Sequence, residues 1–322
     1  MSTELAAAPI ELRGLVKRYG ELTAVDHVDL TVEAGDVFGY LGPNGAGKTT
    51  SLRMMLGLIR PTEGSVRIFG HDPQRGVEAL EGVAGFVEGP QFYPYLPGRV
   101  NLELLAALDG GEAHSRVDEV LDIVELGRRG KDKVGGYSHG MRQRLGIAAA
   151  LLRRPRLLLL DEPATGLDPG GMRDMRRLIK RLASEGMTVL LSSHLLAEVE
   201  ELCNRVAIVQ TGRVVYEGSL EELRATAGLR YRLRTTNDSR ATRICRAQPG
   251  VDVADEDADG LVIHAEHDDA FAELSRALVE ADVLVRELSP QLATLEDLFF
   301  RLTEGGDEPP AGRAPASETS TA

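Results

Sequence analysis

The run GPNGAGKTT has the residue types and spacing of a phosphate-binding loop. It follows an apolar run and precedes a segment with helical spacing, which is the order that this motif requires. Glycines let backbone N–H groups turn toward an anion, and the start of a helix adds partial positive charge. Lys48 is expected to reach the β- and γ-phosphates, and Thr49 to place its hydroxyl on Mg²⁺. The predicted nucleotide contacts in this loop are Gly42, Pro43, Asn44, Gly45, Ala46, Gly47, Lys48, Thr49 and Thr50.

A pair of carboxylates follows a second apolar run, in LLLLDEP. Asp161 and Glu162 would stand at the carboxyl end of a buried strand, where ligands bind in open α/β sheets. We expect Asp161 to hold Mg²⁺ through water, and Glu162 to orient and deprotonate the water that attacks a γ-phosphate. Taken alone, the two motifs could be a glycine-rich turn and an acidic turn without ligands. Their combination favours a nucleotide site.

The segment YSHGMRQRL supplies a third element, because it opens a predicted helix whose N-terminal amides and dipole can hold an anion. Ser138 could also be no more than a helix N-cap. Together with the two preceding motifs, however, the segment resembles the signature of ATP-binding cassette (ABC) ATPases, which usually reads LSGGQ. The resemblance extends from about Ile10 to Arg224 and implies ATP as the nucleotide, with Mg²⁺.

The resemblance implies a dimer in which the signature of one cassette completes the ATP site of the other. Ser138 and Gly140 would then touch the γ-phosphate bound by the partner, and Asp168, in GLDP, would lie between the two sites. The dimer could be a homodimer or a heterodimer of cassettes. His139 replaces the first glycine of the usual signature pair.

Three more residues take roles only through this resemblance. His194, which ends TVLLSSH, matches the switch histidine that holds the γ-phosphate and positions Glu162 and water. Tyr19, in KRYG, matches the aromatic residue that stacks on adenine, although core packing would explain it equally well. Glu88 stands where the family has the Q-loop glutamine and could coordinate Mg²⁺ or its water through a carboxylate oxygen.

The elements that must position these residues indicate an α/β domain over residues 9–224. Val37–Leu41, Leu157–Leu160 and Met187–Leu191 are apolar on both faces, as expected for strands in the middle of a covered sheet. Residues 97–152 have helical spacing and are predicted to be a helical insertion. The resemblance implies a P-loop NTPase cassette, with a RecA-like core, a β-subdomain and a helical subdomain.

The rest of the chain differs from the cassette in pattern. Residues 225–303 are predicted to form a small α+β accessory domain. Residues 304–322 are rich in Gly, Pro, Ala, Ser and Thr and are predicted to be a disordered tail. The appended domain and VEGPQFYPYLPGRVNLELL resemble the ATPase subunits of ABC-2-type exporters, which include the drug- and antibiotic-resistance group. This resemblance implies a separately encoded membrane permease as partner.

Composition restricts the alternatives. The 322-residue chain has a net charge of −13, which argues against sequence-independent binding to nucleic acid. Its two cysteines are consistent with a reducing compartment, and no apolar run approaches the roughly 20 residues that span a bilayer. We expect a cytoplasmic protein that reaches the inner face of the membrane through the permease. The alternatives are a soluble ABC ATPase that remodels ribosomes or DNA, and a nucleotide-dependent clamp.

Overall fold

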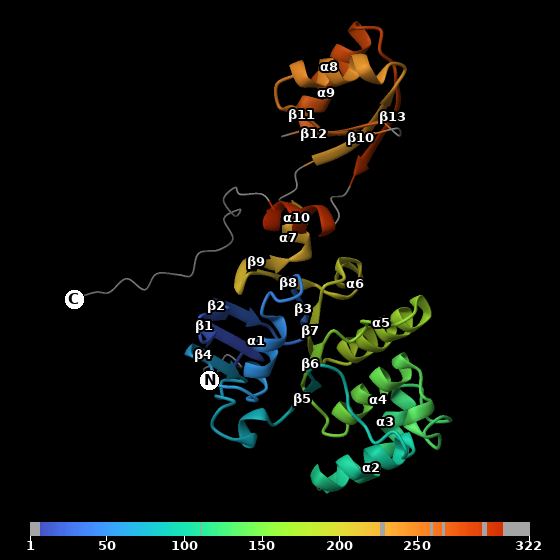
Figure 1. Cartoon of the computed structure of the whole chain (residues 1–322). Coiled ribbons are helices and arrows are strands. Elements are labelled where there is room, and N and C mark those ends of the chain that lie inside the picture. Colours follow the sequence, from blue (N-terminus) through green and yellow to red (C-terminus); the bar gives the residue numbers. More distant parts are fainter. Residues whose placement is uncertain are drawn as a thin grey trace, which may run out of the picture. The chain divides into compact units, whose positions relative to one another are not determined.

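The computed structural model (Figure 1) describes residues 7–109, 111–225, 229–257, 260–265, 268–291 and 295–304. This part of the chain divides between Ser219 and Leu220 into two units, each with its own core. The predicted tail 304–322 lies outside the described residues, except for Glu304, which ends a helix.

The N-terminal unit begins with a three-stranded antiparallel sheet in the order β2-β1-β4. The β1–β2 hairpin turns through two residues, since Tyr19 pairs with Leu22 and Gly20 has a φ of 57°. Alternate apolar residues of the hairpin are buried. The strands are β1 (Ile10–Tyr19), β2 (Leu22–Val32) and β4 (Glu63–Ile68).

A six-stranded sheet forms the centre of this unit, and only its last strand pair is antiparallel. Every residue of β3, β6 and β7 is buried, which confirms the prediction of strands that are apolar on both faces. Because these neighbours are parallel, their carboxyl ends meet at one edge of the sheet. In spatial order the strands are β5 (Val83–Phe86), β6 (Leu157–Asp161), β7 (Thr188–Ser193), β3 (Val37–Leu41), β8 (Arg205–Gln210) and β9 (Arg213–Ser219).

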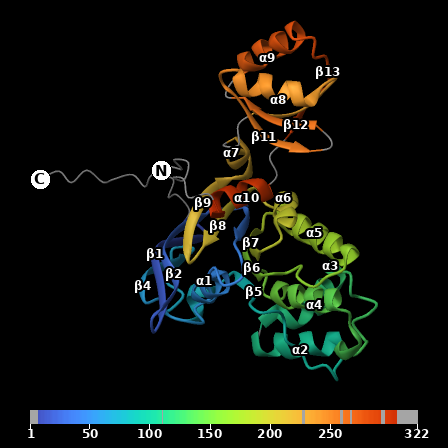
Figure 2. The same ribbon diagram turned by 45° about the horizontal axis from the view of Figure 1, so that its top comes forward.

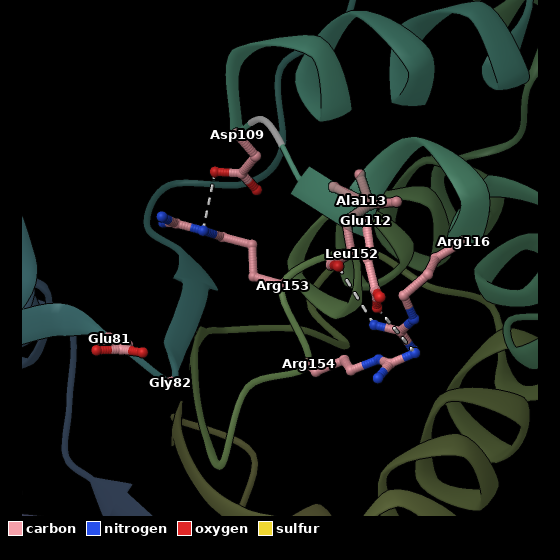
Figure 3. A pocket seen from close by; sticks show the side chains of 9 residues that line it. All are labelled: Glu81, Gly82, Asp109, Glu112, Ala113, Arg116, Leu152, Arg153 and Arg154. Carbon is pink, nitrogen blue, oxygen red and sulfur yellow. Dashed lines mark hydrogen bonds and ion pairs between the residues drawn. The ribbon is translucent and has the colours of Figure 1, made fainter.

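The predicted insertion folds as helices, which Figure 1 shows grouped to one side of the six-stranded sheet. Arg116 is 8% exposed, and its guanidinium donates to the carbonyl oxygens of Leu151 and Leu152 at the end of α4. Arg153 pairs with Asp109 and so joins the end of α4 to α2 (Figure 3). The elements are α2 (Gly98–Asp109), α3 (Val117–Ile123), α4 (His139–Leu151) and the 3₁₀ turns Gly111–Arg116 and Val134–Gly136.

The other helices of the N-terminal unit each follow a strand of the central sheet or its loop. The α5 helix is amphipathic, and its four buried apolar residues recur at helical spacing. It starts with Pro169 in its first turn and with Asp168 as N-cap. The helices are α1 (Lys48–Met55), α5 (Pro169–Ser184) and α6 (Leu196–Leu202), with a 3₁₀ turn at Val77–Leu80.

The C-terminal unit contains a four-stranded antiparallel sheet in the order β11-β12-β10-β13, with the β-α-β-β-α-β connection of ferredoxin-like domains. Helices α8 and α9 lie on one face of this sheet (Figure 2) and form a core with it, so the unit has the predicted α+β class. Its elements are α7 (Leu220–Ala225), β10 (Leu229–Thr235), α8 (Asp238–Ala247), β11 (Val251–Asp257), β12 (Gly260–Ala265), α9 (Asp268–Glu280), β13 (Val285–Gln291) and α10 (Leu295–Glu304).

Candidate functional site

The phosphate-binding loop leaves the carboxyl end of β3 and runs into α1. Gly47 has a φ of 98°, and a Cβ atom there would lie 2.2 Å from the carbonyl oxygen of Ala24. No side chain fits at this position, so the turn needs glycine. Residues Pro43, Asn44 and Gly45 form the exposed tip, Ala46 is buried, and Thr49 and Thr50 lie in the first turn of α1.

The Lys48 side chain folds back along the loop and is only 5% exposed. Its Nζ atom donates to the carbonyl oxygen of Gly42 at 2.7 Å and to that of Pro43 at 3.2 Å. Nζ also lies 3.5 Å from Glu162 Oε1. The positive charge is therefore held between the loop and the end of β6, where a bound γ-phosphate would meet both.

Two side-chain oxygen atoms that could bind a metal ion, from Thr49 and Asp161, come together beside this loop. Thr49 Oγ1 donates to Asp161 Oδ2 at 3.0 Å. The Asp161 residue is 5% exposed, and its other oxygen accepts from Ser192 Oγ at 2.5 Å. Mg²⁺ prefers oxygen ligands and binds proteins through one or two carboxylates together with substrate phosphates. The donor set of Thr49 and Asp161 fits this ion.

Glu162 stands directly after β6 in a left-handed backbone conformation, with a φ of 48°. Its Oε2 atom accepts from Thr165 Oγ1 at 2.6 Å and lies 2.6 Å from His194 Nδ1. Burial acts to raise the pKa of Glu162, but the hydrogen bond from Thr165 and the charges of His194 and Lys48 outweigh it, so the pKa lies below its usual value. The carboxylate is thus ionised at neutral pH and able to accept a proton.

Ser192 holds this acidic pair in place, and the sequence motifs did not single it out. Asp161 pairs with Ser192 across the β6–β7 ladder. The fully buried Ser192 hydroxyl donates to Asp161 Oδ1 and accepts from the backbone N–H of Glu162 at 3.0 Å. It therefore fixes one carboxylate and the unusual backbone turn of the other. Its position two residues before His194, at the end of an apolar strand, was the only signal.

Glu88 is placed near the site by its backbone. It has a φ of 61°, and its N–H points to Asp161 Oδ2 at 3.4 Å. Its carboxylate instead forms an ion pair with Arg53 on α1. In this conformation the backbone of Glu88, and not its side chain, contacts Asp161.

Ser138 of the signature segment and Asp168 of GLDP lie at the starts of α4 and α5. Ser138 is the N-cap of α4 and accepts from the Met141 N–H at 3.2 Å. Asp168 caps α5 in the same way through the Gly171 N–H. A Cβ on Gly140 would lie 3.6 Å from Leu167, so the two helix starts are neighbours within one chain. Two sets of predicted residues thus assemble, one around the phosphate-binding loop and one around these N-caps.

His139 does not disturb the start of α4. Its ring lies 3.7 Å from the position of a Cβ atom on Gly166, and its Nε2 atom is 3.4 Å from Gln143 Nε2.

Tyr19 ends β1 and is 47% exposed, with Lys17 Nζ 5.0 Å from its ring centroid. Much of the tyrosine ring is therefore accessible, whereas a core residue would be covered.

Comparisons with known proteins identify the family of this chain. The ABC transporter family model matches residues 25–165, and a model of the C-terminal domain of DrrA1-3-like ATP-binding proteins matches residues 218–303. The chain is 39% identical over 299 residues to the bacitracin transport ATP-binding protein BcrA of Bacillus licheniformis, covering 92% of this chain and 98% of that protein. It is also 39% identical over 323 residues to the daunorubicin/doxorubicin resistance ATP-binding protein DrrA of Streptomyces peucetius, covering 94% of each.

A solved structure is similar over the cassette. It is a dimeric post-hydrolysis state of an ATP-binding cassette bound to ADP and Pi, with a TM-score of 0.59 and 27% identity, and the match covers 66% of this chain and 98% of that one. None of the helices in the described part of the chain has the length and apolar character that a bilayer span requires. The chain therefore belongs to the ATP-hydrolysing subunits of ABC transporters, in the group that includes the bacitracin and daunorubicin resistance proteins.

Proposed function

We propose that this chain hydrolyses Mg·ATP to drive a separate ABC-2-type permease that exports an antibiotic or other amphiphilic compound. The observation that carries the ATPase chemistry is the convergence of Lys48 and His194 on Glu162. The Glu162 carboxylate lies 3.5 Å from Lys48 Nζ and 2.6 Å from His194 Nδ1. The permease and its cargo follow from the relatives, which are named for bacitracin transport and daunorubicin resistance.

Each side chain of the site has a role set by its surroundings. Glu162, ionised and directed by Thr165 and His194, would accept a proton from the attacking water. Lys48 and the loop amides would bind the β- and γ-phosphates. Thr49 and Asp161 would hold Mg²⁺, which neutralises the charge that develops on the phosphate oxygens. Glu88 would join them through its carboxylate after releasing Arg53.

The second half of each site would come from a second cassette. Ser138 accepts from the Met141 N–H, so the other first-turn amides of α4, those of His139 and Gly140, would be available to an anion. A partner's γ-phosphate would bind there, with Gly140 allowing close approach. Tyr19 would stack on the adenine of the ATP that its own chain binds through the phosphate-binding loop. The dimeric arrangement of the related cassette with ADP and Pi supports this geometry.

An apolar groove on the helical insertion is suited to the permease. It is lined by residues that follow Glu88 in sequence and by one side of α2. Two leucines of α2 in this groove are exposed to solvent, Leu104 at 44% and Leu108 at 86%. Asn101 is buried and bonds with the backbone of Tyr93, which fixes α2 to the loop that starts at Glu88. A cytoplasmic helix of the permease in this groove would move with the nucleotide site. The protein would thus work on the inner face of the membrane.

The test is ATP turnover by the purified protein, alone and in membranes containing the permease that co-purifies with it. We expect turnover that the permease stimulates, and we expect Leu108→Arg to abolish the stimulation while keeping basal turnover. Val77→Arg, at a residue that is 78% exposed away from the groove, is the matched control. Turnover that never responds to the permease would favour a soluble remodelling ATPase. Binding of ATP without turnover would favour a clamp.

A further inference from the structure

A buried glutamate is hydrogen-bonded to the turn that carries His194. Glu198, in the first turn of α6, is 4% exposed, and its Oε2 atom accepts from Ser193 Oγ at 3.2 Å. The same hydroxyl accepts from the Leu195 N–H at 2.9 Å. Ser193, which precedes His194, therefore binds the backbone of the residue that follows His194. Glu198 in turn binds Ser193.

Helix α6 packs against the sheet, so the Glu198 side chain starts from a fixed position. Val199, next to Glu198, is fully buried, and its Cγ1 atom lies 2.8 Å from where a Cβ on Gly39 of β3 would be. Any larger residue at position 39 would push α6 away. The helix lacks a side-chain N-cap, because Leu195 occupies that position. Glu198 instead reaches back across the turn, in the manner of the third residue of a capping box.

The contact is demanding because the glutamate is poorly solvated. Its Oε1 atom is buried without a hydrogen-bond partner among the described residues, and burial raises the pKa of the group despite the bond from Ser193 and the nearby Arg176 charge. Arg176 pairs with Glu201 one turn further along α6. Burying a carboxyl group with so few hydrogen-bond and charge partners lowers the stability of the fold. This cost indicates that the group serves to hold the conformation of the turn rather than to stabilise the protein.

We infer that Glu198 is a positioning residue for ATP hydrolysis, acting through Ser193 to hold the His194 ring against Glu162. The path runs from α6 through Glu198 Oε2 and Ser193 Oγ to the turn, and from His194 Nδ1 to Glu162 Oε2 at 2.6 Å. Without the carboxyl the turn can relax, and the histidine leaves the base while the phosphate-binding loop stays unchanged. The inference rests on the proposed roles of His194 and Glu162.

The experiment measures kcat and KM for ATP on the full-length protein with Glu198→Ala, Glu198→Gln, Ser193→Ala and the double alanine variant. Loss of a bond to a buried carboxyl predicts a kcat lowered about tenfold to hundredfold in Glu198→Ala, with KM changed by less than about threefold. Ser193→Ala should lose a similar factor, and the double variant no more than either. Glu198→Gln keeps an acceptor oxygen and should restore most of the turnover.

Two controls separate this role from simple damage. Glu201→Ala removes the exposed partner of Arg176 on the same helix and should leave kcat unchanged. His194→Ala should abolish turnover. If His194→Ala stays active, the proposed function of the histidine fails together with the inference. If His194→Ala is inactive but Glu198→Ala and Ser193→Ala turn over normally, or if their effects simply multiply, the inference alone is overturned.

Discussion

Replacing Ser192 by alanine removes one hydroxyl that serves both acidic residues of the site. The hydroxyl is fully buried, donates to Asp161 Oδ1 at 2.5 Å and accepts from the Glu162 N–H at 3.0 Å. Alanine fits the strand sterically, so the backbone can remain in place. The substitution therefore isolates the two hydrogen bonds.

The expected cost follows from the groups left behind. A buried donor or acceptor that loses its partner costs about 1–3 kcal/mol, so the two groups together predict a free energy of unfolding lowered by about 2–6 kcal/mol. Turnover should fall as well, because the left-handed turn at Glu162 loses the bond that holds its N–H. A loss of about tenfold or more in kcat is expected, at 1.4 kcal/mol per factor of ten.

Chemical denaturation and steady-state ATPase measurements on the same preparation test this prediction. Ser184→Ala is the matched control, since that exposed hydroxyl donates to the carbonyl oxygen of Arg181 within its own helix. Its effect on stability should stay within about 0.5 kcal/mol. A Ser192→Ala variant that matches Ser184→Ala in both measurements would refute the role assigned to the hydroxyl.

Three further predictions concern binding, assembly and pH. Lys48→Ala should abolish ATP binding measured by calorimetry, because the loop loses its buried cation, and undiminished affinity would reject the phosphate-binding role. Ser138→Arg should leave ATP binding intact but block dimer formation in size-exclusion chromatography, and a normal ATP-dependent dimer would contradict the shared site. Burial raises the pKa of Glu198 above its usual 4.5, so the folded protein keeps a proton that the unfolded chain releases. Its stability should therefore fall as pH rises from that value through the raised pKa, and denaturation of Glu198→Gln should lack this part of the fall.

The sequence predicted the central sheet and the phosphate-binding loop well because both depend on local patterns. Val37–Leu41 and Leu157–Leu160 are apolar on both faces, and such strands have few alternatives to the middle of a sheet. The loop motif places glycine where the backbone takes a left-handed conformation, as at Gly47 with its φ of 98°. The short edge strand Val83–Phe86, with four residues and no alternation, carried no comparable signal.

The polar residues behind the site could not be predicted, because their roles depend on tertiary contacts or on the shape of one turn. Ser192 meets Asp161 only through the pairing of β6 with β7, and Glu198 meets Ser193 across the turn before α6, which packs against Gly39. Serine and glutamate at these positions resemble ordinary strand-end and helix residues. For Glu88, sequence placed the residue near Asp161, but only the structure shows its carboxylate paired with Arg53.

The central claim, that ATP is enclosed between two copies of this chain, is tested most directly by the molar mass of Glu162→Gln in the presence of Mg·ATP. Loss of the base should slow hydrolysis by about 10²–10⁴ and so preserve the nucleotide. Light scattering should then show a dimer with one ATP per protomer, which Ser138→Arg in the same background returns to a monomer. An ATP-loaded monomer at saturating nucleotide would contradict the account.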